Sequence, residues 1–390
     1  MGGTCVHSLF LVFVIIIGIC FSASQLQAAG TGSTATLNLH SSASSKLHEP
    51  TNLEEQRKDF LAWVQSVGER VANSAAAAAA AEKAAWLLAN KAGGTVLTVS
   101  KSGGAQFTSI QAAVNTIPKR NSQRVVIHIA AGVYHEKVFV PKNKPYVTFL
   151  GAGKDVTKIT WGDTKSSTKS GKTQDSATVG VNSVGFIARG ITFENSAPAP
   201  PPGAVGRQAV AFKIAGDKGA LYDCSFLGAQ DTLFDDHGRH YFENCYIQGS
   251  IDFIFGDGQS LYKGCQLHTL SINPGSLTAQ KRSSPSSSTG FSFVDCKVDG
   301  SGLLFLGRAW GAYSRVVFSY TYLGNVIIPK GWYNWGVSGR EKTVYYGEYK
   351  CSGPGANQNG RVAWAHELTD AEAAPFQSLN FIDGASWLQS

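Results

Sequence analysis

One four-residue pattern decides the fold, and it recurs as Asp223-Cys224-Ser225-Phe226, Asn244-Cys245-Tyr246-Ile247, Gly264-Cys265-Gln266-Leu267 and Asp295-Cys296-Lys297-Val298. Its cysteines are 21, 20 and 31 residues apart, and the related stretch Gly190-Ile191-Thr192-Phe193 precedes them. A period of about twenty residues with occasional insertions is what one coil of a parallel β-helix requires. Because each coil buries its face against its neighbours, the pattern predicts a solenoid in which the cysteines stack as a ladder.

The composition agrees with a large, turn-rich β protein. Of the 390 residues 43% are hydrophobic and 16% are charged, with 43 Gly and a single Met. That hydrophobic share is ample for a core, so a globally disordered chain is excluded. Length alone suggests two or three domains, but a solenoid is one long domain. We therefore expect an all-β fold with an N-terminal helical segment.

The N-terminus is typical of a secretory signal peptide. Residues 9–21 form an apolar run, which is short for a membrane span of about 20 residues but normal for the core of a signal. Small residues at 22–24 and at 27–29 offer cleavage sites. The residues before the run include no Lys or Arg and only His7, which keeps a signal anchor as the alternative. We expect residues 1–29 to be a cleaved signal.

Residues 30–92 separate this leader from the β-rich part of the chain. Residues 30–52 are rich in Ser, Thr, Gly and Ala, a composition typical of a linker. The alanine run at 75–81 has strong helix propensity. One helical face is formed by Leu53, Phe60, Val64, Val67 and Val71. We expect a linker and an Ala-rich helix over 30–92, followed by a β-helix domain over 93–390.

The net charge of the chain indicates which class of partner it binds, and its cysteines indicate which redox compartment it occupies. Lys and Arg total 34 against 27 Asp and Glu, a formal charge of +7, which favours a polyanion: nucleic acid, acidic lipid or acidic polysaccharide. Five cysteines follow the leader, none in a CxxC spacing, which argues against a zinc site. One or two disulfides suit an oxidising compartment. Buried packing between coils is the simpler role for most of these thiols.

Two carboxylates stand out among otherwise apolar coils. Asp231 and Asp252 are 21 residues apart, so a stacked solenoid places them about 5 Å apart. Two carboxylates so close cannot both ionise easily, so one should keep its proton near neutral pH. A nearby Arg would keep the other ionised, and Arg207 and Arg308 are the candidates. The alternative is a polar ladder inside the solenoid without a catalytic role.

Residues 93–388 resemble the plant-type pectinesterase (pectin methylesterase) family. Six ordered stretches carry the resemblance: Gly132-Val133-Tyr134-His135-Glu136, Gly190-Ile191-Thr192-Phe193-Glu194-Asn195, Gln208-Ala209-Val210, Gln230-Asp231-Thr232-Leu233, Asp252-Phe253-Ile254-Phe255-Gly256 and Leu306-Gly307-Arg308-Ala309-Trp310. The resemblance implies a right-handed parallel β-helix. It also implies removal of methyl esters from homogalacturonan in the cell wall, with release of methanol.

The resemblance also implies roles for individual residues. Asp252 takes the place of the nucleophile, Asp231 that of the proton donor, and Gln230 that of the transition-state stabiliser. The substrate-binding positions of the family correspond to Thr173, Gln208, Arg308 and Trp310. The stretch around Thr173 departs from the family's Thr-Phe pattern, because Gln174 follows it. No metal or other cofactor is implied.

Partners and location follow from the same resemblance. It implies methyl-esterified homogalacturonan as the partner rather than nucleic acid, a monomer secreted to the cell wall without stable membrane insertion, and a proteinaceous pectinesterase inhibitor as a further partner. Many plant members carry an inhibitor-like helical region with its own cysteines. Residues 30–92 are too short for it and contain no Cys, so we expect a member that lacks the inhibitory pro-region.

Three other functions remain open at this point. A pectate lyase or polygalacturonase would act on the same polymer, but a calcium-dependent lyase needs clustered acidic ligands and a basic proton acceptor. The aspartate pair flanked by glutamines fits ester hydrolysis better. A non-catalytic wall-binding β-helix would be favoured if a catalytic residue were missing, and none is. A short-chain acyl thioesterase is the remotest alternative.

Overall fold

The computed structural model describes residues 94–201, 203–271 and 274–388. The signal peptide, linker and Ala-rich helix expected in residues 1–92 lie outside the described residues. Within the described residues, no helix is both long enough and apolar enough to cross a membrane.

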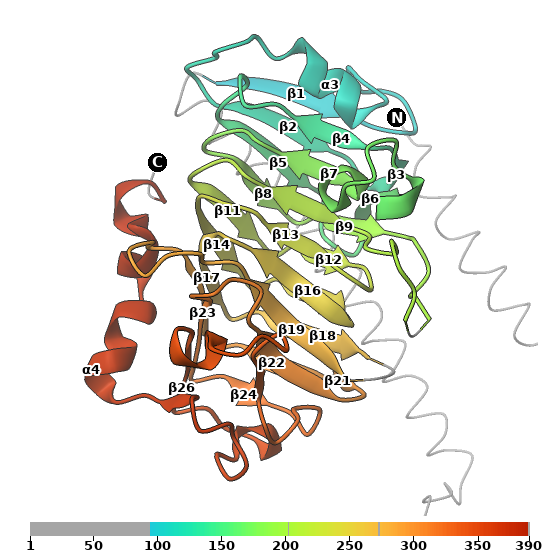
Figure 1. Cartoon of the computed structure of the whole chain (residues 1–390). Helices are drawn as coiled ribbons and strands as arrows, with labels where there is room; N and C mark the ends of the chain where they lie inside the picture. The colour runs from blue at the N-terminus through green and yellow to red at the C-terminus, as the bar shows by residue number, and fades with distance from the viewer. Residues whose placement is uncertain (1–93, 202, 272–273, 389–390) are drawn as a thin grey trace, which may run out of the picture. The chain divides into compact units, whose positions relative to one another are not determined.

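Three parallel sheets are wound from successive turns of the chain (Figure 1), each complete coil adding one strand to each sheet. Sheet A contains β1 (Thr95–Val99), β2 (Val125–Ile129), β5 (Val147–Gly151), β8 (Ile187–Arg189), β11 (Gly219–Tyr222), β14 (Arg239–Glu243), β17 (Gln259–Lys263), β20 (Gly290–Val294), β23 (Arg315–Ser319), β26 (Tyr345–Tyr349) and β27 (His366–Glu367). Sheet B contains β3 (Gly132–His135), β6 (Thr157–Trp161), β9 (Thr192–Asn195), β12 (Ser225–Leu227), β15 (Tyr246–Gly249), β18 (Gln266–Leu270), β21 (Lys297–Ser301) and β24 (Tyr322–Leu323). Sheet C contains β4 (Val138–Val140), β7 (Val179–Val181), β10 (Phe212–Ile214), β13 (Leu233–Asp235), β16 (Ile251–Gly256), β19 (Gly275–Gln280), β22 (Leu304–Arg308) and β25 (Trp332–Tyr333). The predicted parallel β-helix is confirmed.

The recurring sequence pattern forms the corner between sheet A and sheet B. Its first residue has a positive φ, 51° at Asp223, 54° at Asn244, 63° at Gly264 and 54° at Asp295. Gly, Asn and Asp are the residues that adopt this left-handed conformation at least cost. The residue after it, a Cys in all four cases, turns into the core. The pattern therefore repeats because the coils from β8 to β24 all make a two-residue turn between sheet A and sheet B.

The cysteines form the predicted ladder. Cys224, Cys245, Cys265 and Cys296 are all buried in the main core. The Sγ of Cys265 lies 3.6 Å from the carbonyl oxygen of Phe242, one coil earlier, and the neighbouring cysteines make the same kind of contact. Stacking between coils therefore explains their spacing.

The expectation of disulfides is wrong for the described residues, because Cys351 and the four ladder cysteines are all free thiols. Burial raises the pKa of Cys224, Cys245 and Cys265 well above the usual value. The thiolate is the species that enters disulfide exchange. Thiols that stay protonated and bonded to backbone carbonyls are poor partners for oxidation.

Aromatic side chains continue the stacking through the centre of sheet A. The rings of Phe242 and Tyr262 are 4.5 Å apart at 6°, those of Tyr262 and Phe293 4.6 Å apart, and those of Phe293 and Phe318 4.5 Å apart. Offset stacking of this kind adds roughly 0.5–1.5 kcal/mol per pair beyond burial. The ladder fixes the register of the coils that carry the polar residues of sheet C.

Short helices cover the first coil and one outer face. Helix α3 (Ile110–Thr116) packs on the core of the first coil, and its N-cap Ser109 accepts a hydrogen bond from the Ala112 backbone N–H. After β26, the chain crosses the outer face of sheet A through α4 (Asp370–Ala373), η5 (Ala374–Phe376), η6 (Leu379–Ile382) and η7 (Gly384–Ser386) (Figure 1). Two further turns, η3 (Arg340–Lys342) and η4 (Pro354–Ala356), lie in the loops before and after β26.

The free thiols lead to a direct test. Alkylation of the unfolded, unreduced protein followed by peptide mass spectrometry should label Cys224, Cys245, Cys265, Cys296 and Cys351. Reductant should leave the melting temperature unchanged, since no disulfide bond between these five cysteines contributes to stability. A peptide pair linked through any two of these cysteines would contradict the ladder of free thiols.

Candidate active site

Three of the polar residues singled out in the sequence, Gln230, Asp231 and Asp252, lie where strands of sheet C begin, whereas Arg308 ends β22. Asp231 lies two residues before β13, and Asp252 is the second residue of β16. Gln230 and Ile251 form a parallel bridge, and the Asp231 backbone N–H donates to the Ile251 carbonyl at 3.0 Å. The two aspartates therefore lie on adjacent coils, as the 21-residue spacing predicts.

Both aspartates have an unusual backbone conformation. The φ angle is +63° at Asp231 and +49° at Asp252. In addition, the register between β16 and β19 shifts between Ile251 and Ile254, so Asp252 lies on a β-bulge that redirects its side chain. A non-glycine residue in this region costs on the order of 1–3 kcal/mol and persists where the surroundings hold it. Such strain is common at functional sites.

Two residues, Arg308 and Ser276, donate hydrogen bonds to the Asp252 carboxyl group. Arg308 Nε donates to its Oδ1 at 2.6 Å, and Arg308 Nη2 donates to its Oδ2. Ser276 Oγ also donates to Oδ1. Asp252 is only 6% exposed, and a two-pronged guanidinium contact is among the strongest charge-assisted pairings available to it. The Arg308 guanidinium in turn lies 4.1 Å from the centre of the Trp335 ring, a cation–π contact that fixes its plane.

Asp231 is in the opposite electrostatic situation. Burial raises its pKa well above the usual value, and the negative charge of Asp252 raises it further, while Arg308 and Lys165 lower it in part. No hydrogen bond from a described residue reaches its carboxyl group. The pair is therefore split, with Asp231 as a neutral acid beside an ionised Asp252.

Two glutamine side chains lie beside the two aspartates and make no hydrogen bond with the described residues. Neither the Gln208 nor the Gln230 amide hydrogen-bonds to a described residue, and Gln208 Oε1 is buried. Gln230 and Arg308 also line a cleft of about 280 Å³, whose other wall is the proline-rich loop around 199–204. Amides left free beside a split pair of carboxyl groups are available to a bound ligand.

Aromatic rings make a flat surface next to the aspartates. Phe234 stacks on Phe255 at 4.4 Å and 10°, and Trp310 lies 6.1 Å from Phe255. Lys213 Nζ is 5.6 Å above the Phe234 ring, and Lys281 Nζ is 4.8 Å above that of Trp310. Flat apolar faces flanked by ammonium groups suit a ligand built of rings that carry negative charge.

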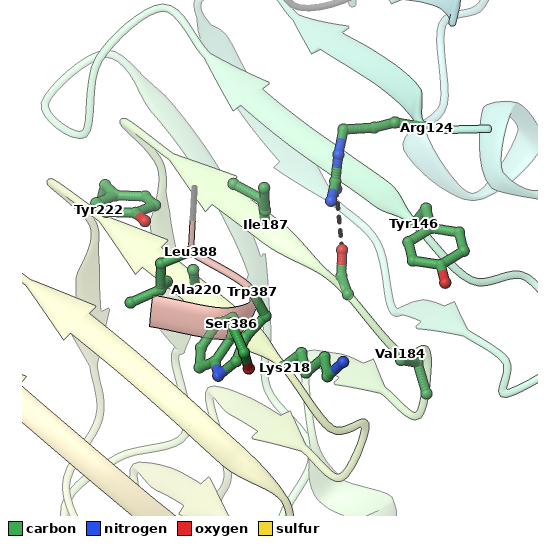
Figure 2. Close-up of a pocket in the computed structure, with 11 residues that line it drawn as sticks. Arg124, Tyr146, Val184, Ile187, Lys218, Ala220, Tyr222, Ser386, Trp387 and Leu388 are labelled. Atoms are coloured by element: carbon green, nitrogen blue, oxygen red, sulfur yellow. Dashed lines mark hydrogen bonds between the residues drawn. The ribbon is translucent and has the colours of Figure 1, made fainter. Parts of the chain in front are cut away.

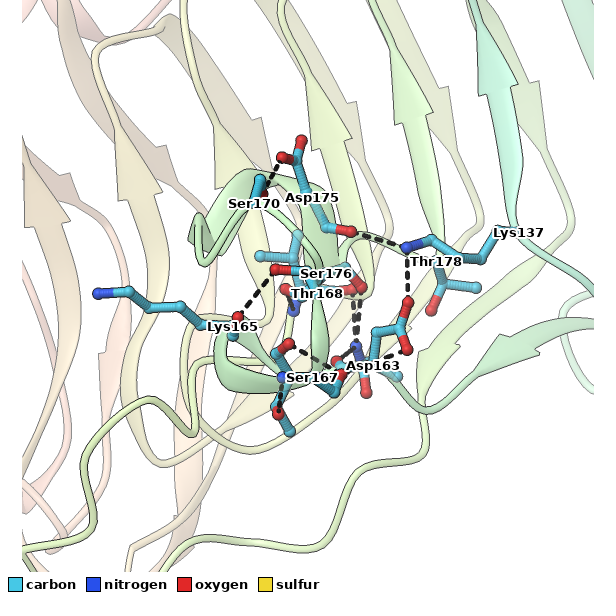
Figure 3. Close-up of polar contacts among 12 residues, drawn as sticks. Lys137, Asp163, Lys165, Ser167, Thr168, Ser170, Asp175, Ser176 and Thr178 are labelled. Carbon is cyan, nitrogen blue, oxygen red and sulfur yellow. Dashed lines mark hydrogen bonds and ion pairs between the residues drawn. The ribbon is translucent and has the colours of Figure 1, made fainter.

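The loop between β6 and β7 contributes a polar network (Figure 3). Lys137 Nζ bridges the Asp163 carboxylate and the Asp175 carbonyl, both at 2.7 Å. The network holds η1 (Lys165–Ser167) and η2 (Thr173–Ser176). The Lys165 N–H donates to the Gln208 carbonyl at 2.7 Å, which ties the loop to the site.

The structure does not bring every predicted residue to the pair. The Thr173 carbonyl accepts from Ser176 Oγ, but the Thr173 side chain makes no hydrogen bond with a described residue, and its role stays a prediction. Of the two candidate arginines, Arg308 pairs with Asp252, whereas Arg207 Nε is buried with no hydrogen-bond partner among the described residues.

Sequence reasoning missed Ser276 and Lys165. Ser276 lies 24 residues after Asp252, in a longer coil that a period of 20 or 21 does not align. Lys165 lies in a loop whose path no repeat predicts, and its side chain extends away from the polar network (Figure 3).

The parallel β-helix and the pair of one neutral and one ionised carboxyl group on its face indicate a β-helical hydrolase. Comparison with known proteins identifies the family. Residues 96–385 match the family model described as Pectinesterase. Pectinesterase QRT1 of Arabidopsis thaliana is 47% identical over 302 residues, which cover 75% of this chain and 79% of that protein. The chain therefore belongs to the pectinesterase family and is an enzyme of that class.

Solved structures agree with this assignment. Pectin methylesterase from carrot matches with a TM-score of 0.70 and 36% identity, covering 75% of this chain and 94% of that one. A pectin methylesterase from Aspergillus niger matches with a TM-score of 0.65 and 28% identity, covering 75% and 95%. The fold is the right-handed parallel β-helix of these proteins, as predicted.

The raised pKa of Asp231 predicts a pH-dependent stability. The folded protein holds this proton more tightly than the unfolded chain, whose Asp pKa is about 3.9, so stability is lost as the pH rises through the raised pKa. Asp231→Asn is neutral throughout and should melt at a higher temperature than the wild type, by a margin that grows from about pH 4 upward. Calorimetry across this range measures it, with the exposed Asp155→Asn as control. A variant that becomes less stable relative to wild type as pH rises would contradict the assignment.

Proposed function

We propose that this pectinesterase hydrolyses the methyl esters of homogalacturonan through an aspartyl acyl-enzyme. The observation that carries the proposal is the split carboxyl pair. Asp252 is held ionised by Arg308 and Ser276, while burial and the charge of Asp252 raise the pKa of Asp231. One group is thereby prepared as a nucleophile and the other as an acid.

The first step is acylation. An Asp252 carboxylate oxygen attacks the carbonyl carbon of the ester, and the electron pair of the C=O bond moves onto oxygen. The free amides of Gln208 and Gln230 donate to this oxyanion, typically a large part of the stabilisation. When the tetrahedral intermediate collapses, the C–OCH₃ bond breaks and Asp231 gives its proton to the departing methoxide. Methanol leaves, and an anhydride links Asp252 to the sugar acid.

The second step is hydrolysis of this anhydride. Asp231, now a carboxylate, takes a proton from water, and the resulting hydroxide attacks the galacturonyl carbonyl. The bond to Asp252 breaks, which regenerates its carboxylate and frees the carboxylic acid of the galacturonyl unit, which stays in the polymer and loses its proton to the solvent. Asp231 ends the cycle protonated. The proton thus returns to the group whose environment favours the neutral form.

The surroundings of the site support an acidic, ring-built polymer as substrate. Trp310 and Phe234 offer flat faces, and Lys213 and Lys281 lie above them. These contacts suit homogalacturonan, whose sugar rings can stack on an aromatic face and whose free carboxylates can pair with Lys281, whereas Lys213 already pairs with Asp236 at 3.2 Å. Relatives described as pectin methylesterases point the same way.

We further propose a secreted monomer that modifies the cell wall, without stable membrane insertion. The apolar run at 9–21 supports secretion, and pectin is a wall polymer. A proteinaceous pectinesterase inhibitor is proposed as a second partner. Residues 30–92 are short and free of Cys, so we do not assign them an inhibitory role.

A calcium-dependent lyase is less well supported. Within the described residues, no three His, Cys, Asp or Glu side chains converge as a metal-binding group. The two carboxyl groups beside Gln208 and Gln230 instead match the needs of acyl transfer.

The products separate the esterase from enzymes that cut the chain. With highly methylated homogalacturonan, the protein should release methanol without unsaturated ends or new reducing ends, and excess chelator should not abolish the activity. De-esterified polygalacturonate, which offers no methyl ester, is the control and should give no methanol. Chain scission as the main reaction would refute the proposal.

Substitution of the two aspartates should impair catalysis in different ways. Asp252→Asn removes the nucleophile and should eliminate both turnover and any covalent intermediate. Asp231→Asn keeps the nucleophile but loses the acid and the later base, so turnover should fall by about 10²–10⁴-fold. Acid-quenched mass spectrometry should then detect accumulated acyl-enzyme in Asp231→Asn alone. Near-normal activity of Asp252→Asn would require a mechanism built around Asp231.

The contacts of Asp252 predict how variants of its partners should behave. Arg308→Ala removes the cation that pairs with the nucleophile and orients it, so the maximal rate should fall. Ser276→Ala should lower the maximal rate by less, and Ser276→Thr, which keeps the hydroxyl group, should restore it. Arg189→Ala, which breaks an exposed pair with Asp223, is the control. An unchanged maximal rate in Arg308→Ala would show that the pair does not prepare Asp252 for attack.

A further inference from the structure

A groove lies on the outer face of sheet A, next to the end of the C-terminal segment. That segment covers sheet A from Ala220 in β11 onward, with Phe376 and Ile382 buried against the sheet. The groove, of about 280 Å³, is bordered by Leu388 and lies over the strands β8 and β11 (Figure 2). The aspartate pair belongs to sheet C, so the groove is separate from the catalytic cleft.

The groove combines aromatic rings with cations. Tyr146 and Tyr222 border it, and Arg124 and Lys218 lie between them and the rest of the lining (Figure 2). Tyr146 is 40% exposed although it carries a large ring. None of the described residues that line the groove is acidic. Aromatic faces with a few charged groups among them are typical of ligand pockets.

Arg124 is fixed in place but keeps donors available. Its Nη1 donates to Thr148 Oγ1 at 3.0 Å and to the Gly185 carbonyl at 2.9 Å (Figure 2). Its Nε and Nη2 make no hydrogen bond with a described residue, and no carboxylate in the described part of the chain forms an ion pair with it. Burial lowers the pKa of the guanidinium. A bound anion would therefore stabilise a charge that is partly desolvated and unpaired.

Lys218 supplies a second cation to the groove. It lies directly before β11, and its side chain makes no ion pair with a described residue. The adjacent Asp217 does not neutralise it, because both Asp217 carboxylate oxygens accept hydrogen bonds from Arg239. The groove therefore carries two positive charges that the described residues leave without a counter-charge.

A neighbouring hollow adjoins the groove on the side of the catalytic face. This hollow, of about 350 Å³, shares Val184 with the groove and is also lined by Lys142, Lys213 and Asp217. Lys213 lies above the aromatic surface beside the two catalytic aspartates and pairs with Asp236. Lys142 is exposed and forms no ion pair with a described residue. The hollow thus gives a polymer an open path from the active site to the groove.

We propose that this groove binds a de-esterified segment of homogalacturonan and so anchors the polymer whose methyl esters the active site removes. The sugar rings can pack against Tyr146 and Tyr222, and each removed ester leaves a carboxylate that can pair with Arg124 or Lys218. A fully methyl-esterified segment carries no charge and binds less well. The identity of the polymer rests on the function proposed above, whereas the preference for an acidic sugar chain rests on the lining of the groove.

Binding of fully de-esterified polygalacturonate, which offers no ester to the active site, tests the groove in the full-length protein. Arg124→Gln combined with Lys218→Gln, the groove variant, should bind about tenfold more weakly in affinity electrophoresis, as expected for the loss of a charge-assisted contact. Lys119→Gln combined with Lys263→Gln removes two exposed charges outside the groove and should bind like the wild type. Wild-type affinity of the groove variant, or equal weakening of both double variants, would overturn the proposal.

Hydrogen exchange locates the contact. Polygalacturonate should slow exchange of the amides at the starts of β8 and β11 in the wild type but not in the groove variant. Lys218→Gln breaks no contact with a described residue, so it serves for both measurements if Arg124→Gln does not fold. Slowing confined to sheet C would contradict the proposal. So would a groove that is protected without polymer and unchanged by it, because another part of the chain or a second copy would then occupy it.

Kinetics separates the groove from the catalytic function. On a long, partly methylated polymer the groove variant should show a KM about tenfold higher and an unchanged kcat, as expected for a loss of binding alone. On methyl-esterified trigalacturonate, which is too short to reach both sites, it should match the wild type. An unchanged KM on the long polymer would overturn the proposal. If no substrate released methanol while polygalacturonate still protected the groove, the esterase proposal would fail and the groove would stand.

Discussion

Stacking of equivalent positions, one strand spacing apart, is the constraint on which the rest of this structure depends. It places thiol on thiol in the core and ring on ring from Phe242 to Phe318. On the face of sheet C the same geometry forces Asp231 next to Asp252. Charges so close do not ionise together, and the Arg308 contact decides which of the two does. The chemistry of the site is thus a consequence of the repeat.

The periodic features could be predicted from the sequence. The two-residue corners require Gly, Asn or Asp in a left-handed conformation, and these residues precede the cysteines at readable intervals. The same interval separates Asp231 from Asp252, so their adjacency follows without any structure. The family resemblance then identified Arg308 as a site residue, because its motif is continuous in the chain.

Features outside the repeat could not be predicted in the same way. Ser276 follows a longer coil, and Lys165 lies in a loop, so no fixed spacing leads to either. The disulfide expectation rested on the compartment and ignored the backbone carbonyls that engage each sulfur, such as that of Phe242 for Cys265. The contact predicted for Thr173 depends on a loop conformation and on a bound substrate, neither of which a local motif contains.

The corner between sheets A and B is two residues long in every coil except the one from β5 to β6, where five residues intervene, whereas the corners on both sides of sheet C vary widely. Before sheet C, 17 residues separate β6 from β7, and one residue separates β15 from β16. Insertions therefore accumulate around the cleft and leave the ladders of the core in register. In evolutionary terms, insertions and substitutions in the loops around the cleft can change how the enzyme binds its polymer. The stacked core that makes the fold stable can stay the same.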